Sequence, residues 1–181
     1  MKKFELTNEF IANRFGTKLF RIRALVEFGD VEAGELGGYV EKESNLGHDD
    51  NAWVYGNARV YGDALVYDNA RVYDNAWVYG DAQVSGDARV YGNAWVCGNG
   101  DYAYAHGFGS VNRTTTFFRL KDGGVGVRCG CFYGTLAQFR DKIRETHGET
   151  KKAQEYLMLA DLMELRFEED ENEVGNRKYV E

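Results

Sequence analysis

The sequence predicts a mainly β protein whose centre is a three-sided β-helix of about three turns. Eight six-residue units run without a gap from Asn51 to Gly98, and each reads [Asn/Asp]-Ala-x-Val-[Tyr/Ser/Cys]-[Gly/Asp]. A strict period of six does not fit an α-helix, in which side chains return every ~3.6 residues. It fits a chain that makes one short strand and one turn per unit, so that three units complete one turn of the coil.

Each position of the unit has a physical role in such a coil. The valine points inward and fills the prism, and the alanine is small enough for the crowded corner. Asparagine, aspartate and glycine take the turn conformations that β-branched residues resist. Equivalent residues, 18 apart in the sequence, then stack at the spacing of neighbouring strands, about 4.8 Å.

The chain divides into three predicted parts. Residues 1–35 form a small N-terminal β element, in which residues 18–24 alternate apolar and charged side chains as a half-buried strand does. Residues 36–106 form the β-helix, and residues 107–181 form an α+β C-terminal cap.

The predicted cap has a ββαα order. The turn Lys121-Asp122-Gly123-Gly124 predicts a hairpin between its two strands. Thr135 and Gln138 have the spacing of a capping box, which predicts the start of a helix that ends near Gly148. The four predicted elements span residues 114–119, 125–132, 135–148 and 151–166.

Composition limits the classes of protein that the sequence can encode. The formal net charge of −7 disfavours nonspecific binding to nucleic acid. Three cysteines, an odd number, and the absence of an apolar N-terminal stretch argue against a secreted protein framed by disulfides. No apolar run approaches the ~20 residues that span a bilayer. We therefore expect a soluble cytoplasmic protein with no membrane partner.

The residues that flank the inward valines fall into three outward faces when the period of 18 is applied. Two faces are rich in tryptophan, tyrosine and arginine. Such rings can stiffen the stack through contacts between neighbouring strands. They also dominate binding interfaces, which makes a trimer or dimer of this chain the first expectation, and stacking of nucleotides on the rings is a further alternative. The candidate binding residues are Trp53, Arg71 and Arg89 on one face, and Arg59, Tyr61, Trp77, Tyr79 and Trp95 on another.

The repeat resembles that of the hexapeptide-repeat left-handed β-helix superfamily over residues 36–98. An apolar residue followed four positions later by a small one is met by Val54 and Ala58 and by every later pair. The residue after the apolar one is usually small or acidic in that superfamily, and here it is mostly tyrosine. The resemblance implies a left-handed coil and association along the coil axis, commonly as a trimer.

The best-known members of that superfamily are acyltransferases, which use a histidine at a subunit interface as the general base. His48 lies in a predicted two-residue bulge between the inward residues Leu46 and Val54, and His106 lies where the repeat ends. These two residues are the candidate bases if the chain transfers acyl groups. The coils contain no long excursion loop of the kind that builds the acceptor site in those enzymes, so we expect no catalytic residues and no cofactor.

Cys129 and Cys131 lie two apart on a predicted strand, so their side chains would face the same way. With Cys97, His106 or His147 they could bind zinc. Free cysteine is among the most buried residue types, and the sequence has no second motif of paired ligands, so core packing is the preferred interpretation.

Four basic residues share the predicted hairpin and can form a local basic patch: Arg113, Arg119, Lys121 and Arg128. The preceding Asn112 and the threonines beside it offer donors for an anion. No glycine-rich loop matches a phosphate-binding fingerprint, so a solvated strand face is the preferred interpretation.

The layout also resembles that of uncharacterised proteins carried by bacteriophages and prophages. The shared features are Gly-Gly-Tyr-Val-Glu before the repeat, units of [Asn/Asp]-Ala-[Arg/Trp]-Val-Tyr, and a cap with Thr-Thr-Thr-Phe-Phe and Cys-Gly-Cys-Phe-Tyr-Gly-Thr-Leu. The resemblance implies a small, non-enzymatic accessory protein that binds a protein of the bacterial host, for example to inhibit a defence system. A hexapeptide-repeat acyltransferase and a nucleotide-sequestering protein are the alternatives.

Overall fold

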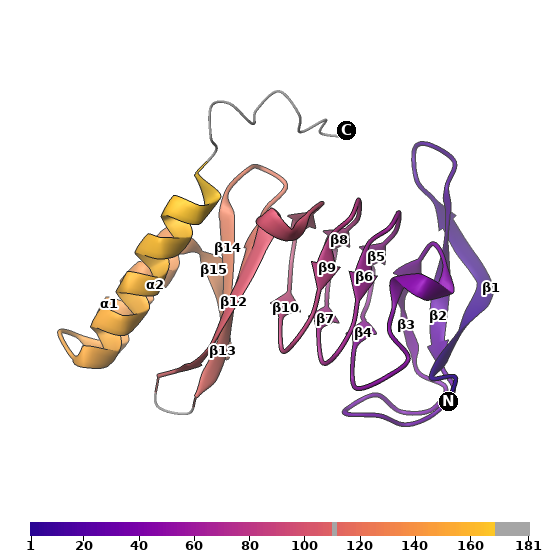
Figure 1. Cartoon of the computed structure of the whole chain (residues 1–181), viewed down its shortest axis with the longest axis horizontal. Helices are drawn as coiled ribbons and strands as arrows, with labels where there is room; N and C mark the ends of the chain where they lie inside the picture. Colours follow the sequence, from indigo (N-terminus) through magenta and orange to yellow (C-terminus); the bar gives the residue numbers. More distant parts are fainter. Residues whose placement is uncertain (110–111, 169–181) are drawn as a thin grey trace.

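The computed structural model describes residues 1–109 and 112–168 and shows an elongated molecule (Figure 1). A β-hairpin lies at one end, the coiled repeat lies in the middle, and a small α/β cap lies at the other end. Most elements are strands, and the coil has about three turns. The fold class predicted from the sequence is therefore confirmed.

The repeat forms a solenoid with one two-residue strand in each unit. The strands are β4 (Trp53–Val54), β5 (Arg59–Val60), β6 (Leu65–Val66), β7 (Arg71–Val72), β8 (Trp77–Val78), β9 (Gln83–Val84), β10 (Arg89–Val90) and β11 (Trp95–Val96). Strands 18 residues apart pair in parallel, so that each valine lies beside a valine of the next turn. The three faces of the coil are β4-β7-β10, β5-β8-β11 and β6-β9. Two short 3-10 helices, η1 (Glu43–Asn45) and η2 (Asn99–Asp101), flank the repeat.

The interior of the solenoid follows the repeat. The eight valines and eight alanines of the units are each at most 1 % exposed. Seven unit ends have a positive φ, which glycine tolerates and which Asp68 and Asp74 also adopt. At Gly80 an added Cβ would overlap the carbonyl oxygen of Cys97, so the backbones of successive turns approach each other closely there.

The N-terminal element extends one face of the solenoid. β1 (Phe4–Ala12) and β2 (Lys18–Ala24) form an antiparallel hairpin, and β2 pairs with β3 (Leu36–Val40). β3 also pairs in parallel with β5, so the hairpin and the solenoid share one six-stranded sheet. Phe4 and Ile22 belong to the same core as the valines, and the hairpin therefore closes the first end of the coil.

Lys3 ties this hairpin to the first turn of the solenoid. Its ammonium group donates hydrogen bonds to the carbonyl oxygens of Asp49 (3.3 Å), Asp50 (3.4 Å) and Ala52 (2.9 Å). The residue is 2 % exposed, and this burial lowers the pKa of its amine to about 8. These bonds hold the bulge that precedes the regular repeat.

The cap is a four-stranded antiparallel sheet with two helices on its outer side (Figure 1). Its elements are β12 (Tyr102–Phe108), β13 (Arg113–Arg119), β14 (Val125–Cys129), β15 (Phe132–Thr135), α1 (Leu136–His147) and α2 (Lys151–Phe167). The sequence predicts only two strands here, at residues 114–119 and 125–132. It does not predict β12, which begins where the repeat loses its register. A turn also divides the second predicted strand into β14 and β15. The capping box of Thr135 and Gln138 is confirmed.

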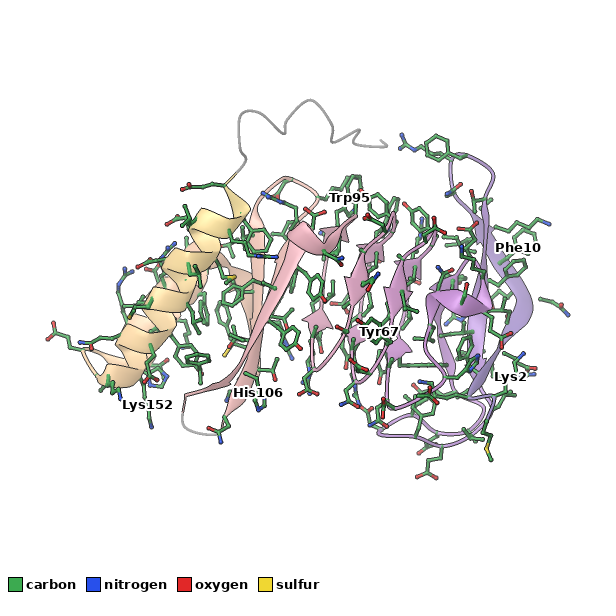
Figure 2. The ribbon with its side chains drawn as sticks, in the orientation of Figure 1. Lys2, Phe10, Tyr67, Trp95, His106 and Lys152 are labelled. Atoms are coloured by element: carbon green, nitrogen blue, oxygen red, sulfur yellow. The ribbon has the colours of Figure 1, made fainter. Side chains whose placement is uncertain are left out.

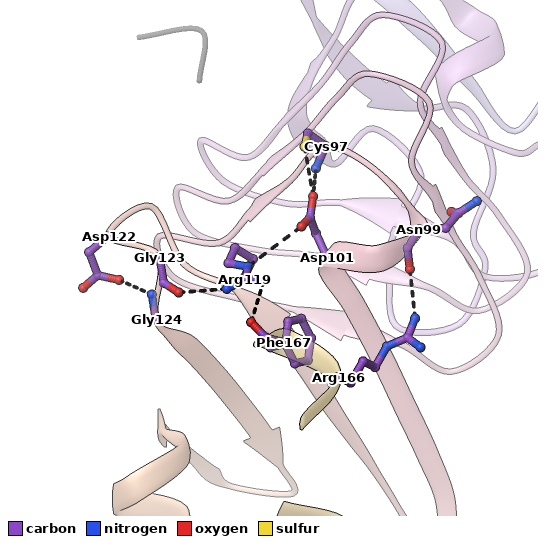
Figure 3. Close-up of polar contacts among 9 residues, drawn as sticks. All are labelled: Cys97, Asn99, Asp101, Arg119, Asp122, Gly123, Gly124, Arg166 and Phe167. Atoms are coloured by element: carbon purple, nitrogen blue, oxygen red, sulfur yellow. Dashed lines mark hydrogen bonds and ion pairs between the residues drawn. The ribbon is translucent and has the colours of Figure 1, made fainter. Parts of the chain in front are cut away.

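Buried polar contacts join the solenoid to the cap (Figure 3). The backbone N–H and the Sγ of Cys97 donate to Asp101 Oδ2 at 3.0 and 2.9 Å. Arg119 lies 3.9 Å from Asp101 Oδ1 and donates to the carbonyl oxygens of Gly123 and Phe167 at 3.1 and 2.9 Å. The last turn of the coil, the cap hairpin and the end of α2 are thus fixed relative to one another.

Candidate functional site

The most developed outward surface is the tryptophan face, which we define as Arg59, Tyr61, Trp77, Tyr79 and Trp95 on the outer side of β5, β8 and β11. Trp77 stacks on Trp95, and Tyr61 stacks on Tyr79, with ring centroids 5.2 Å apart in each pair. The two columns meet edge to face, since Tyr61 lies 6.4 Å from Trp77 and Tyr79 lies 6.4 Å from Trp95. All four rings are half-buried and keep one side in water.

Two cations lie at the ends of the tryptophan column. The guanidinium carbon of Arg59 is 4.9 Å from the centroid of Trp77, and the ammonium of Lys121 is 5.0 Å from that of Trp95. Lys121 belongs to the cap hairpin, so the cap contributes to this face. The period of 18 predicts both columns, and the strand pairing confirms them. The sequence offers no signal that would place Lys121 on Trp95.

The stacked tyrosines of this face ionise at high pH. Burial raises the pKa of Tyr61 to about 12 and also raises the pKa of Tyr79, whereas tyrosine in an unfolded chain has a pKa of about 10. The fold therefore favours the neutral form. Its contribution to stability is complete below a pH of about 10 and is lost as the pH rises through about 12. We expect alkaline unfolding in this window, measured by circular dichroism together with tyrosinate absorbance.

The control for this prediction is the double variant Tyr61→Phe/Tyr79→Phe. It keeps both rings and removes both ionisable groups, so its alkaline transition should move to higher pH. A transition that stays in place would contradict the assignment of the effect to this column.

A second aromatic column lies on the outer side of β4, β7 and β10. Tyr55, Tyr73 and Tyr91 stack with successive centroid separations of 4.4 and 4.2 Å. The guanidinium of Arg128, from β14 of the cap, lies 4.4 Å from the centroid of Tyr91 and ends the column. The cap therefore contacts both aromatic faces of the solenoid.

Trp53 does not belong to an exposed surface. It leaves the coil on the outer side of β4, but it is 0 % exposed because Phe4 and Phe28 cover it at centroid distances of 6.2 and 5.3 Å. The expectation that Trp53 is available for binding is therefore wrong. Its covering residues come from the N-terminal element, which the repeat pattern does not place.

Arg71 and Arg89 line a cleft between the solenoid and the cap, with a volume of about 480 Å³. Arg113 and Arg128 line the same cleft from the cap side. We call it the arginine cleft. Its lining residues are Asn51, Asn69, Arg71, Asp87, Arg89, Arg113, Thr114, Arg128 and Gly130.

The basic patch expected on the cap hairpin is divided in the structure. Arg113 and Arg128 line the arginine cleft, whereas Arg119 is 6 % exposed and lies beside Asp101. Lys121 lies on Trp95. The sequence indicates the charges of Arg113 and Arg128, but it does not show that they meet two arginines of the solenoid.

The two histidines considered as general bases occupy different ends of the molecule, and His106 is labelled on β12 in Figure 2. His48 Nδ1 accepts a hydrogen bond from the backbone N–H of Lys3 at 3.2 Å, so the neutral ring donates through Nε2 to Glu43 Oε1 at 2.9 Å. His48 therefore has no free lone pair for a substrate. His106 Nδ1 contacts Thr114 Oγ1 at 2.8 Å on an exposed strand. Neither histidine lines the arginine cleft.

Cys129 and Cys131 do not face the same way. β14 ends at Cys129, and Gly130, with a φ of 59°, begins the turn to β15. Cys129 is half-buried and accepts a hydrogen bond from Thr115 Oγ1 at 3.1 Å, whereas Cys131 is exposed. Within residues 1–109 and 112–168, no three or more His, Cys, Asp or Glu side chains are grouped to hold a metal ion.

The fold defines a β-solenoid repeat protein. More particularly, the repeat matches the family model of the YdcK beta solenoid repeat at residues 52–68, 64–80 and 82–98. All three matched segments lie in the solenoid. A comparison with curated proteins gives no match. None of the helices in the described part of the chain is long and apolar enough to cross a membrane.

Proposed function

We propose that this β-solenoid protein is a non-enzymatic binding protein and that the tryptophan face is its interaction surface. The observation that supports the proposal is the continuous cluster of four half-buried rings on the outside of β5, β8 and β11. Tryptophan, tyrosine and arginine are the residue types most enriched at the energetically important positions of interfaces. Their rings also present a large apolar surface with a polar atom at the edge.

The same contacts stiffen the solenoid, and the two roles are compatible. Stacking within the columns and edge-to-face contacts between them hold each ring in one orientation. Arg59 and Lys121 restrict the outer rings of the tryptophan column further. A surface that is ordered in advance loses less conformational entropy when a partner binds, so this stiffness favours binding.

The first partner that we propose is a second copy of this chain, in a trimer or a dimer. The resemblance of the repeat to a superfamily of trimers supports this part of the proposal. The layout shared with phage and prophage proteins supports a further partner, a protein of a bacterial host cell, and thus a cytoplasmic role such as inhibition of a host defence system.

The test is the double variant Trp77→Ala/Trp95→Ala, compared with the native protein by native mass spectrometry and light scattering. We expect the association constant to fall about 30-fold or more, because two interface rings are removed, while far-ultraviolet circular dichroism stays unchanged. The matched control is Tyr67→Ala. Tyr67 is half-buried beside Val66 of β6, on a different face from Trp95 (Figure 2).

Two results would reject the proposal. One is a folded double variant that keeps the oligomeric state of the native protein and captures the same host proteins as the native protein does. The rings would then only stiffen the coil. The other is a native protein that is monomeric at high concentration and captures no partner. The variant Trp95→Lys, which places a charge on the same surface, repeats the test if the double variant is misfolded.

A further inference from the structure

We propose that the arginine cleft binds a small anion that carries two or more phosphate groups. The cleft lies on the β4-β7-β10 side of the solenoid and at its junction with the cap, away from the tryptophan face. The inference is therefore independent of the proposed interaction surface. It also differs from the nucleotide alternative considered from the sequence, which places the ligand on the aromatic rings.

The arginine cleft carries a concentrated positive charge. Four arginines line the cleft against one carboxylate, Asp87, among the described lining residues, although the whole chain has a formal charge of −7. Positive charges gathered in a cleft repel one another and raise the local concentration of anions. A multivalent anion between them would relieve this repulsion and would gain several charge-assisted hydrogen bonds.

Three of these guanidinium groups lack an acidic partner in the described part of the chain. Arg71 is paired, because its Nη1 donates to Asp30 Oδ2 at 2.6 Å. Arg89, Arg113 and Arg128 have no carboxylate within 4.0 Å in the described part of the chain. No carboxylate therefore competes with a ligand for these three guanidinium groups.

Contacts with the solenoid and within the cap restrict the two cap arginines, Arg128 and Arg113. Arg128 stacks on Tyr91, and its Nη1 donates to the carbonyl oxygen of Cys131 at 3.3 Å, while its buried Nε has no acceptor among the described residues. The guanidinium of Arg113 fills the space beside Gly130, where an added Cβ would overlap Nη1. Planar groups fixed in this way suit paired hydrogen bonds to phosphate oxygens.

The walls and the size of the cleft specify the ligand further. Asn51 Nδ2 donates to Asn69 Oδ1 at 3.0 Å, and Asn69 Nδ2 donates to Asp87 Oδ1 at 3.3 Å, which forms a ladder of polar groups. No aromatic or aliphatic side chain is among the described lining residues, unlike ordinary ligand pockets. The volume of about 480 Å³ is far above the ~30 Å³ share of a water molecule in the liquid. It leaves room for several phosphate groups.

The test is calorimetric titration of the full chain with inorganic tripolyphosphate at low ionic strength. We expect saturable binding that weakens as salt is added. The double variant Arg89→Gln/Arg113→Gln should bind ~100-fold more weakly, since each charged hydrogen bond contributes about tenfold or more. The matched control Lys142→Gln/Arg144→Gln removes the same formal charge from α1, where both side chains are exposed, and should bind like the native protein.

Further ligands define the chemistry. A nucleoside triphosphate that binds more tightly than tripolyphosphate would indicate a nucleotide as the source of the phosphate groups, and equal affinity would indicate an inorganic one. Orthophosphate or citrate that binds as tightly as tripolyphosphate would overturn the proposal, as would no saturable heat with tripolyphosphate or a cleft variant that binds like the control.

Two measurements keep the test independent of folding and of the tryptophan face. If the double cleft variant loses its circular dichroism spectrum, the single variant Arg89→Gln replaces it, with an expected loss of about tenfold. The Arg89 side chain is exposed, and its removal leaves the stacking of Arg128 on Tyr91 intact. Trp77→Ala/Trp95→Ala should bind tripolyphosphate like the native protein, whatever its oligomeric state.

Discussion

Replacing Trp53 by alanine is expected to lower the free energy of unfolding by about 3–5 kcal/mol. The side chain is fully buried between Phe4 and Phe28, so its loss would leave a cavity between the N-terminal hairpin and the first turn of the solenoid. The same change at Trp95 should lower the free energy by only about 1–2 kcal/mol, because this ring is half-buried and less apolar surface returns to water. Urea denaturation followed by far-ultraviolet circular dichroism measures both values.

Trp53→Phe is the control for this prediction. The indole Nε1 is buried without an acceptor among the described residues, so phenylalanine removes an unpaired donor while it keeps a ring between the two phenylalanines. The loss of stability should be clearly smaller than for alanine. Equal losses at Trp53 and Trp95 would contradict the burial that separates these two residues.

Replacing Gly80 by alanine is expected to lower the free energy of unfolding by about 2–5 kcal/mol. The φ of 65° at this residue disfavours any L side chain by about 1–2 kcal/mol. The new Cβ would also overlap the carbonyl oxygen of Cys97, which belongs to the backbone and cannot move aside without shifting a turn, and such overpacking adds about 1–3 kcal/mol. Thermal and urea denaturation of the purified variant measure the loss.

Gly56 is the matched control for Gly80. It ends an equivalent unit with a φ of 60°, but an added Cβ there would lie 3.7 Å from the nearest backbone atom, the carbonyl oxygen of Asp74. Gly56→Ala should therefore show only the backbone effect, and Gly56→Asp should be milder still, because Asp68 and Asp74 adopt this conformation in the native chain. If Gly56→Ala and Gly80→Ala lose the same stability, the close approach of the turns is not what limits Gly80.

The solenoid and its columns could be predicted because their contacts recur at one spacing in the sequence. The partner of Val60 is Val78, and the partner of Trp77 is Trp95, each 18 residues later. A single period therefore places the core, the turns and the outward rings. The capping box at Thr135 could be predicted for a related reason, since its partners lie within three residues.

The contacts between the three parts of the chain could not be predicted in this way. Phe28 covers Trp53, Asp101 lies beside Arg119, and Arg113 shares a cleft with Arg89, but no repeated spacing links these residues. They meet because the hairpin and the cap dock on the ends of the coil. For this reason the predicted exposure of Trp53 was wrong, and the predicted basic patch of the hairpin arginines was incomplete.

Because strands 18 residues apart pair in parallel, the number of units in the solenoid sets the rotation of the cap relative to the hairpin about the coil axis. Adding one six-residue unit between Arg89 and the cap would rotate the cap by a third of a turn, so that Arg113 and Arg128 would no longer meet Arg71 and Arg89. A duplication of three units would restore that phase and lengthen the rod by about 4.8 Å. We therefore expect an insertion or deletion of a whole turn to preserve the orientation of the hairpin relative to the cap, whereas a change of one or two units would not.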